Sequence, residues 1–426
     1  MRSRDAVGLV GLVTFLSLDL AACTTSLSTR AQPAYGVGVE TVVFVDQTRS
    51  TPAGAGDVVR PGRRLETTIW YPARPRPRGR VPLVVFAHGL GAAPSGYETI
   101  LRSWARAGYV VAAPAFPGSR AEALGGPDAG DYVAQPADMS FVIDGVIGLA
   151  RGTGPLRDLV DPQRVGAAGH SLGGVTTLGL VANTCCRDRR VRAAVVMAGD
   201  QLDFPGGRYD PASNPPLLVI HGDRDPAVPY RAGVEAFANA LPPKGLVSIR
   251  GGDHGAPAGA TGARAALDFF DRYLRADTGA LQRLAADLRK AGNARLDLVT
   301  RAGVPVRLPP TSAPVGTRTA SVSPHDGLTD GEKVTVAWQG FGRGTLLNIV
   351  ECSRNPPTGA GDCDLARAAL FVAAGAGGTG SAAFTVHAGA IGSGMCDAVH
   401  STCVVVVNEG GSSAPQDSVI TPIRFR

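Results

Sequence analysis

A serine with a glycine two places away on either side is the feature that most constrains how this chain can fold. The segment Gly169-His170-Ser171-Leu172-Gly173 directly follows a strand-like run, Arg164–Ala168, and directly precedes a helical stretch. In so sharp a strand-to-helix turn, a side chain at either glycine would collide with the backbone, and the serine hydroxyl is pushed above the sheet. The free N–H groups at the helix start favour negative charge that develops there. The pattern predicts a nucleophilic serine, Ser171, rather than a glycine-rich turn with an incidental serine.

A serine hydroxyl is a poor nucleophile until a base takes its proton, and the base needs an orienting acid. We expect the base on a loop after the last strand of the sheet, where His254 stands in the segment Gly251–Gly255. The acid should follow the preceding strand, and two carboxylates compete there. Asp225 has the later position in this loop and is the predicted acid, whereas Asp223 is better suited to shaping the turn. Asp200, after an earlier strand, is a third candidate.

Two backbone N–H groups are also needed to bind the oxyanion that forms when a serine attacks a carbonyl carbon. One should belong to Leu172, the residue after the nucleophile. The other should come from His88-Gly89-Leu90-Gly91, which follows the strand-like run Leu83–Ala87. The glycines let this backbone approach a substrate, and we expect Leu90 to supply the second N–H group.

The other histidines near these motifs are His88, His170 and His221. We interpret them as turn-stabilising residues rather than proton carriers. A metal site is not expected, because no acidic or cysteine residues accompany them at the spacing of metal ligands. The predicted chemistry needs no organic cofactor either.

Short apolar runs alternate with helical stretches between Tyr35 and about Leu298. Continuous apolar runs are typical of parallel strands buried on both faces, and the alternation predicts an α/β fold with a doubly wound, mostly parallel sheet. The first two strands follow each other without a helix, which predicts an antiparallel edge. From Ala320 onward, short Val- and Thr-rich runs alternate with Gly-rich turns, and this texture predicts a small all-β sandwich.

The motifs Phe86-Ala-His-Gly-Leu-Gly91, Gln135-Pro-Ala-Asp138, Gly169-His-Ser-Leu-Gly-Gly174 and His221-Gly-Asp-Arg-Asp225 resemble those of the α/β-hydrolase superfamily. The chain order serine, acid, base is also that of this superfamily. Among its branches the chain is similar to proteins described as dienelactone-hydrolase-like, chlorophyllase-like or platelet-activating-factor acetylhydrolase-like, and its layout is close to that of bacterial cutinases. Dienelactone hydrolases proper use a cysteine nucleophile. The resemblance therefore implies hydrolysis of carboxylic esters through an acyl-enzyme on the serine, not that pathway reaction.

The C-terminal segment Ser323–Val336, together with two close pairs of cysteines, resembles the neocarzinostatin family. The resemblance implies an immunoglobulin-like sandwich with two short-loop disulfides, Cys352–Cys363 and Cys396–Cys403. A structural or adhesive spacer and a module that binds an apolar ligand both remain open as its role. Elsewhere, Cys185-Cys186 stands near the end of the helix after the serine, and we favour one buried thiol there over a vicinal disulfide.

The N-terminus has the pattern of an export signal: Arg2 and Arg4 precede an apolar run, Ala6–Leu18. Leu20-Ala-Ala-Cys23 resembles the lipobox of bacterial lipoproteins, which implies a lipid anchor at Cys23, while ordinary secretion and an uncleaved anchor are the alternatives. The expected organisation is a signal peptide (1–22), a tether (23–34), a catalytic domain (35–300), a linker (301–319) and a sandwich (320–426).

The formal net charge is +6, and the basic residues are nearly all arginine. No basic stripe interleaved with aromatic residues stands out, so nucleic-acid binding is not favoured. Too few residues separate the strand near Gly199 from the one at Leu217 for a helical cap, which fits lipidic, bulky or polymeric esters. The sequence thus predicts an exported, monomeric serine esterase at a membrane surface or in the medium. An amidase or thioesterase with the same triad, or a non-catalytic surface protein that binds an apolar ligand, is the alternative.

Overall fold

The computed structural model describes residues 34–53, 56–301, 317–342, 345–357, 362–364, 367–375, 377–400, 402–409 and 418–426. The predicted signal peptide, Cys23 and most of the predicted linker lie outside these residues. None of the described helices is long and apolar enough to cross a membrane.

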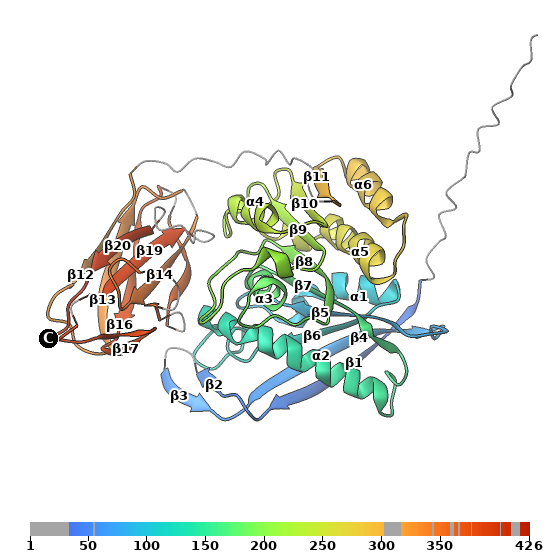
Figure 1. Cartoon of the computed structure of the whole chain (residues 1–426), viewed down its shortest axis with the longest axis horizontal. Helices are drawn as coiled ribbons and strands as arrows, with labels where there is room; N and C mark the ends of the chain where they lie inside the picture. The colour runs from blue at the N-terminus through green and yellow to red at the C-terminus, as the bar shows by residue number, and fades with distance from the viewer. Residues whose placement is uncertain are drawn as a thin grey trace, which may run out of the picture. The chain divides into compact units, whose positions relative to one another are not determined.

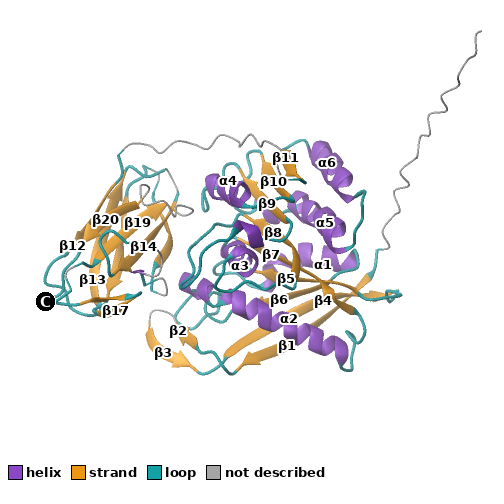
Figure 2. Cartoon of the chain, in the orientation of Figure 1, coloured by secondary structure: helices purple, strands orange, loops and turns teal. Residues whose placement is uncertain are grey.

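A twisted nine-stranded sheet forms the centre of the N-terminal domain, with the order β1-β4-β6-β5-β7-β8-β9-β10-β11 (Figures 1 and 2). Its strands are β1 (Gly36–Asp46), β4 (Arg63–Arg74), β5 (Val81–Ala87), β6 (Val110–Ala115), β7 (Val160–His170), β8 (Val191–Met197), β9 (Leu217–Gly222), β10 (Lys244–Ile249) and β11 (Ala294–Val299). Strands β5 to β10 run parallel to one another, whereas β1, β4 and β11 pair antiparallel at the edges. The predicted α/β class and the predicted antiparallel edge are therefore confirmed.

Helices cover both faces of this sheet, and each face has its own apolar core. The helices are α1 (Glu98–Arg106), α2 (Gln135–Arg151), α3 (Leu172–Ala182), α4 (Tyr230–Asn239), α5 (Ala260–Leu274) and α6 (Ala280–Ala291). Alternate residues of β5 point to opposite faces. Leu83 and Val85 belong to the core that also contains residues of α2, α3 and α4, while Val84 and Phe86 belong to the core with residues of α1, α5 and α6. Burial on both sides explains why the strands in the middle of the sheet are continuous apolar runs.

Two features of this domain were not predicted. The hairpin β2 (Thr51–Ala53) and β3 (Gly56–Arg60) stands beside the sheet, and β11 extends the sheet beyond β10. In β11, Arg295 and Asp297 alternate with half-buried leucines. A short edge strand of this kind buries only one face, so its apolar signal is weak.

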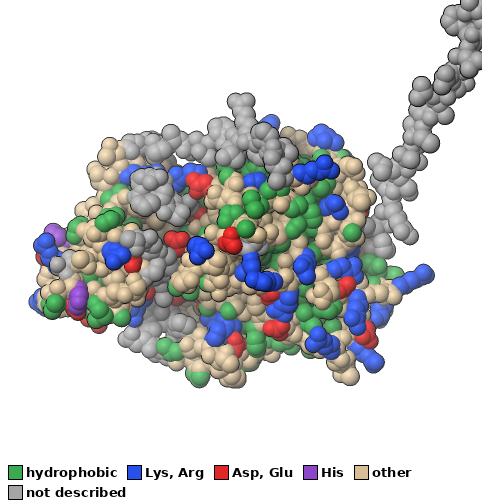
Figure 3. Space-filling view, in the orientation of Figure 1, with side chains coloured by type: hydrophobic (Ala, Val, Ile, Leu, Met, Phe, Trp, Pro, Cys, Tyr) green, Lys and Arg blue, Asp and Glu red, His purple; other side chains and the backbone are tan. Residues whose placement is uncertain are grey.

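Several arginines on the surface of this domain are paired with acidic side chains. Arg190 lies 2.6 Å from Asp188, and Arg283 lies 2.8 Å from Asp277. On the face drawn in Figure 3, Lys and Arg side chains are interspersed with Asp and Glu and with hydrophobic groups. Ion pairs at the surface contribute little stability.

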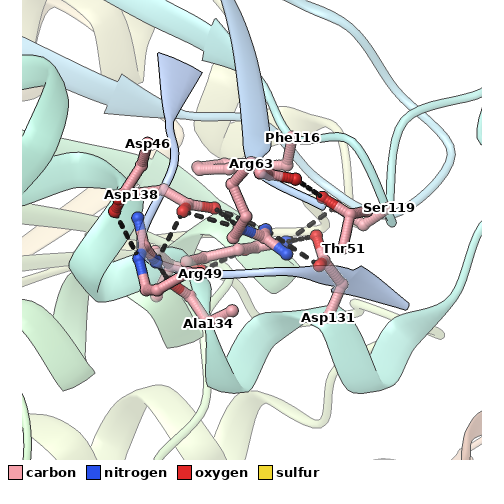
Figure 4. A network of polar contacts seen from close by, with 12 residues as sticks. Asp46, Arg49, Thr51, Arg63, Phe116, Ser119, Asp131, Ala134 and Asp138 are labelled. Carbon is pink, nitrogen blue, oxygen red and sulfur yellow. Dashed lines mark hydrogen bonds and ion pairs between the residues drawn. The ribbon is translucent and has the colours of Figure 1, made fainter. Parts of the chain in front are cut away.

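A buried ionic network ties the antiparallel edge of the sheet to α2 (Figure 4). Arg63 of β4 is fully buried and donates to both carboxylate oxygens of Asp138 at 2.8 and 2.5 Å and to Asp131 at 2.9 Å. Arg49 lies 2.8 Å from the same Asp138 and 2.7 Å from Asp46. Because each carboxylate here faces a guanidinium, removal of one partner leaves an uncompensated charge in the interior.

The substitution Arg63→Met should therefore destabilise the protein strongly. Asp131 and Asp138 would lose their buried cation, and the expected loss in the free energy of unfolding is about 3–5 kcal/mol. Urea unfolding followed by circular dichroism measures it. Arg64→Met is the matched control, because the neighbouring Arg64 side chain is exposed; equal effects of the two substitutions would contradict the prediction.

The C-terminal domain is an all-β sandwich of two antiparallel sheets and a hairpin, which confirms the predicted second architecture. One sheet contains β12 (Thr319–Ser323), β13 (Glu332–Gln339) and β16 (Gly380–Val386); the other contains β15 (Ala369–Ala373), β14 (Leu346–Cys352), β19 (Val404–Glu409) and β20 (Ser418–Pro422); the hairpin is β17 (Gly389–Ile391) with β18 (Gly394–Cys396). Trp338 and Phe384 of the first sheet meet Leu347 and Val405 of the second in the core. Disulfides join Cys352 to Cys363 and Cys396 to Cys403.

One carboxyl group of the sandwich is buried and forms no ion pair with the described residues. Glu351 of β14 is 2% exposed and accepts a hydrogen bond from the His387 backbone N–H at 2.8 Å. Its other carboxyl oxygen has no hydrogen-bond partner among the described residues. Burial raises the pKa of Glu351 to about 8, so the folded sandwich favours the protonated, neutral side chain.

The sandwich should consequently lose stability as the pH rises through the window that this shift defines. A raised pKa of a carboxyl group means that its contribution is complete below the ordinary glutamate pKa of about 4.3 and is lost as the pH rises towards 8. Glu351→Gln keeps an acceptor for the His387 N–H and cannot ionise. Thermal unfolding of both proteins between pH 5 and 9 should show a decline with pH that is smaller in the variant. The same slope in both proteins would contradict the assignment.

Candidate active site

The predicted sharp turn joins β7 to α3. Ser171 has φ 58° and ψ −124°, a conformation that non-glycine residues adopt only under strain, and α3 begins at the next residue. A Cβ atom on Gly169 would lie 2.0 Å from the Gly173 carbonyl oxygen, and one on Gly173 would lie 2.0 Å from the Ala87 carbonyl oxygen. Both glycines are therefore required sterically, as the sequence predicts, because the turn, the first coil of α3 and the end of β5 touch through backbone atoms.

Gly173→Ala should show how much the fold depends on this close approach. The new methyl group would overlap the Ala87 carbonyl, and we expect the free energy of unfolding to fall by about 3 kcal/mol. Gly148→Ala in α2 is the matched control, since nothing lies within 4 Å of its Cβ position. That substitution should raise the stability by about 0.5–1 kcal/mol because alanine favours the helix. Chemical denaturation measures both; a tolerated Gly173→Ala would contradict the steric argument.

His254 and Asp225, the predicted base and acid, lie side by side on the loops that follow β10 and β9. His254 Nδ1 is 2.8 Å from Asp225 Oδ2, and the His254 side chain is 26% exposed whereas that of Asp225 is fully buried. The other carboxylate oxygen, Oδ1, accepts hydrogen bonds from the Ala227 and Val228 backbone N–H groups at 2.8 and 2.9 Å. This arrangement holds one tautomer of the imidazole and leaves its Nε2 atom facing away from the carboxylate.

The negative charge on Asp225 is stabilised by its hydrogen bonds. Burial alone would raise its pKa, but hydrogen bonds from His221 and His254 outweigh burial and hold the pKa well below the usual aspartate range. A carboxylate that stays ionised can stabilise an imidazolium beside it.

The two competing carboxylates have other surroundings. Asp223 accepts a hydrogen bond from the Gly251 backbone N–H at 2.6 Å and so ties the two loops together, which is the turn-shaping role expected for it. Asp200 is 1% exposed, and its Oδ2 atom has no hydrogen-bond partner among the described residues. Burial raises the pKa of Asp200 to about 7, so this group is not a permanent negative charge at neutral pH.

The predicted oxyanion donors flank the serine. A Cβ atom on Gly89 would lie 3.1 Å from Ser171 Cβ, so the loop after β5 passes directly beside the nucleophile. This loop is held by the Gly91 N–H, which donates to the Ser119 carbonyl at 2.8 Å. Among the residues that the structure describes, neither the Leu90 N–H nor the Leu172 N–H has an acceptor. Both donors are thus available to an oxygen atom of a substrate.

His88 and His221 stabilise backbone turns, in line with their interpretation from the sequence. His88 Nε2 accepts from the Phe116 N–H at 3.0 Å, so its Nδ1 carries the proton and lies 2.8 Å from the Gly89 carbonyl. His221 Nε2 lies 3.0 Å from the Val228 carbonyl and 3.3 Å from Asp225 Oδ2. Burial lowers the pKa of His88, which is consistent with a neutral, structural ring.

An apolar cluster surrounds the two oxyanion leucines, and the sequence analysis did not identify it. Its members are Tyr132, Leu172, Val175, Leu202 and Phe204, with Leu90 and Tyr209 packed against them. The tyrosine hydroxyls donate to the backbone carbonyls of Asp203 and Leu202, so the rings present apolar surface. These residues come from the loop after β5, the 3-10 helix η2 (Ala129–Val133), α3 and the β8–β9 loop, and no single periodic segment contains them. Between β8 and β9 the chain forms only the three-residue 3-10 helix η3 (Pro211–Ser213), so residues 198–216 build no helical cap.

The expectation for Cys185 and Cys186 was wrong, because the two residues form a vicinal disulfide. The helix α3 ends at Ala182, so both cysteines lie beyond it in a turn. The Cys185 side chain is exposed there and Cys186 is only half-buried, so neither cysteine is the buried thiol that was expected.

Family models match three parts of the chain. A model described as platelet-activating factor acetylhydrolase, isoform II, matches residues 64–122, and one described as TAP-like protein matches residues 199–283. The neocarzinostatin family model matches residues 320–425. The chain has the fold of an α/β-hydrolase, followed by a neocarzinostatin-like domain. The strand order, with antiparallel strands at one edge and the sharp turn after β7, agrees with the hydrolase matches.

The hydrolase is also 30% identical over 239 residues to NocK of Nocardia uniformis subsp. tsuyamanensis, which is provisionally named an esterase. That match covers 52% of this chain and 64% of NocK, so the chain spans less than two thirds of the relative. Among solved structures, a ferulic acid esterase from Streptomyces cinnamoneus matches at a TM-score of 0.44 and 22% identity, and the match covers 58% of this chain and 93% of that one.

Proposed function

We propose that the hydrolase cleaves carboxylic esters through a covalent acyl-enzyme on Ser171. The observation that carries the proposal is the 2.8 Å contact between His254 Nδ1 and the buried, ionised Asp225. The backbone carbonyl of His254 lies 2.8 Å from the ring of His170, the residue that precedes Ser171 in the strained turn. A base held by a carboxylate, a half-buried serine at a strand-to-helix turn and two backbone N–H groups without an acceptor among the described residues are the groups that acyl transfer needs.

In the first half of the proposed reaction, the Ser171 hydroxyl oxygen forms a bond to the ester carbonyl carbon while His254 Nε2 takes the hydroxyl proton. The negative charge on the carbonyl oxygen is stabilised by the Leu90 and Leu172 N–H groups. The tetrahedral intermediate then breaks the bond to the alcohol oxygen, which receives the proton from His254. In the second half, water attacks the acyl-enzyme by the same route and releases the acid.

Lipidic, bulky or polymeric esters are the proposed substrates. The connection between β8 and β9 builds no helical cap over the carboxyl ends of the strands, which supports access for large groups. The apolar cluster around Leu90 and Leu172 supports an apolar acyl or alcohol group next to the oxyanion donors. The name of NocK as an esterase is consistent with this class of reaction.

The hydrolase is proposed to act outside the cytoplasm, either anchored through a lipid on Cys23 or secreted. Disulfides at Cys185–Cys186, Cys352–Cys363 and Cys396–Cys403 support an oxidising compartment. The neocarzinostatin-like domain would then serve as a spacer or as a site for an apolar ligand.

A second candidate function is a non-catalytic binding protein in which the sandwich carries the activity, and amidase or thioesterase activity is a third. The buried, fully hydrogen-bonded Asp225 argues against a decayed catalytic domain, because an ionised carboxylate in the interior is retained only where it has partners.

Ser171→Ala should abolish hydrolysis of p-nitrophenyl esters, with a fall in kcat of about 10⁴-fold or more, because no other group replaces the attacking oxygen. The assay uses esters of increasing chain length, a phospholipid, a polyester film, and a matched amide and thioester. Preference for the longer esters would support the proposed substrates, whereas faster cleavage of the amide or thioester would contradict them.

The acid is tested in the same assay with a matched pair from one loop. Asp225→Asn should lower kcat by about 10²–10⁴-fold, because the neutral amide cannot stabilise the imidazolium. Asp223→Asn should change kcat little, since Asp223 contacts backbone. If the wild type and Ser171→Ala are equally inactive on every substrate, the catalytic proposal fails and the binding alternative stands.

A further inference from the structure

We propose that His170 is a positioning residue that joins the loop of the catalytic base to the oxyanion loop, with Tyr97 as the connecting group. The inference rests on the proposed function and adds to it a residue that neither transfers a proton nor binds the substrate. Its basis is a continuous chain of hydrogen bonds that runs through the residue just before Ser171.

The contacts connect three separate segments of the chain. His170 Nε2 lies 2.8 Å from the His254 backbone carbonyl oxygen, and His170 Nδ1 lies 2.9 Å from the Tyr97 hydroxyl. The same hydroxyl accepts from the Gly89 backbone N–H at 3.2 Å. The His170 ring is packed against the rings of both neighbours, with centroids 5.6 Å from Tyr97 and 4.8 Å from His254. It is 7% exposed at the end of β7.

With a neutral His170 ring, only one arrangement of hydrogens satisfies all three contacts. A carbonyl oxygen can only accept, so Nε2 of His170 must carry the proton and donate to His254. Nδ1 of the neutral ring is then an acceptor, and the Tyr97 O–H must donate to it. The Tyr97 oxygen keeps a lone pair for the Gly89 N–H. Through a neutral His170, the chain of hydrogen bonds therefore has a fixed direction.

The surroundings of His170 keep it uncharged. Burial lowers the pKa of His170 to about 4, and the nearby His254 and His221 rings act in the same direction against the opposing charge of Asp225. The ring stays neutral over the range in which serine esterases work, and both of its nitrogen atoms are occupied. The hydrogen bonds of both ring nitrogens to groups of the protein support a positioning role rather than that of a second proton carrier.

The link has a geometric consequence for the reacting groups. One end fixes the backbone of His254, whose side chain is the proposed base. The other end fixes Gly89, which lies beside Ser171 and immediately precedes Leu90, the proposed oxyanion donor. One buried ring, that of His170, therefore helps to position the backbone of the base, the serine that follows it and the loop of one oxyanion donor. A small displacement of such groups can lower the rate about 10²-fold without loss of substrate binding.

Two substitutions at His170 separate the two halves of the link. The amide nitrogen of Gln in His170→Gln reaches the position of Nε2 and can donate to the His254 carbonyl. Asn in His170→Asn is shorter, can replace only Nδ1, and leaves the His254 carbonyl without its donor. We expect kcat on the best p-nitrophenyl ester to fall about 10- to 100-fold in His170→Asn and about 3-fold in His170→Gln, with KM nearly unchanged in both.

Tyr97→Phe tests the second half, because it removes the acceptor of the Gly89 N–H and the donor to His170. It should also lower kcat with little change in KM, whereas Tyr273→Phe, a half-buried tyrosine of α5, should leave both constants unchanged. Thermal unfolding of each variant is the control for a loss of fold, and the rate of inactivation by a fluorophosphonate reports attack by the serine without the deacylation step.

The outcomes are decisive in combination with Ser171→Ala. If Ser171→Ala removes the activity and His170→Asn loses far more kcat than His170→Gln at equal thermal stability, the positioning role is supported. Equal activity in all the His170 and Tyr97 variants, equal losses in Asn and Gln, or losses that follow the unfolding temperature would overturn it. Persistent activity in Ser171→Ala would instead overturn the proposed function itself.

Discussion

The close approach of backbone to backbone around Ser171 is the constraint on which the rest of the catalytic domain depends. The end of β5, the turn after β7 and the first coil of α3 touch at Gly169 and Gly173, where even a methyl group would lie 2.0 Å from a carbonyl oxygen. That contact determines where α3 starts and where the loop after β5 must pass. The strained φ of Ser171 is retained because packing on both sides of the sheet overdetermines it.

Around this turn, most of the histidines hold loops in place through hydrogen bonds between their rings and the backbone. His88 joins the loop after β5 to the backbone at Phe116, His221 joins Asp225 to its own loop, and His170 spans Tyr97 and His254. An imidazole suits this purpose, since a neutral ring offers one donor and one acceptor on a rigid frame. His254 differs because a buried carboxylate holds one nitrogen and its side chain stays partly exposed, which are the conditions for a proton carrier.

Buried carboxylates are stabilised in different ways at different places in the protein. At the β1–β4 edge, buried arginines neutralise Asp131 and Asp138 and connect β4 to α2, so the ionic network acts as a brace between an antiparallel edge and a helix. Past β9, Asp225 is stabilised by neutral donors and by His254, which leaves its charge available to the imidazole. In the sandwich, Glu351 has a single neutral donor, the His387 N–H, and burial favours its protonated form.

Much of this was determined by the sequence alone. The steric signature of Gly-x-Ser-x-Gly and the apolar runs predicted the parallel sheet, the helices and the candidate residues Ser171, Asp225 and His254, because local backbone sterics and burial on two faces leave a direct trace in residue type. The edge strand β11, the hairpin β2–β3, the Cys185–Cys186 bond and the Tyr97–His170 link left no such trace. They depend on contacts between segments far apart in the chain or on where a helix happens to end, and only the folded tertiary structure decides those.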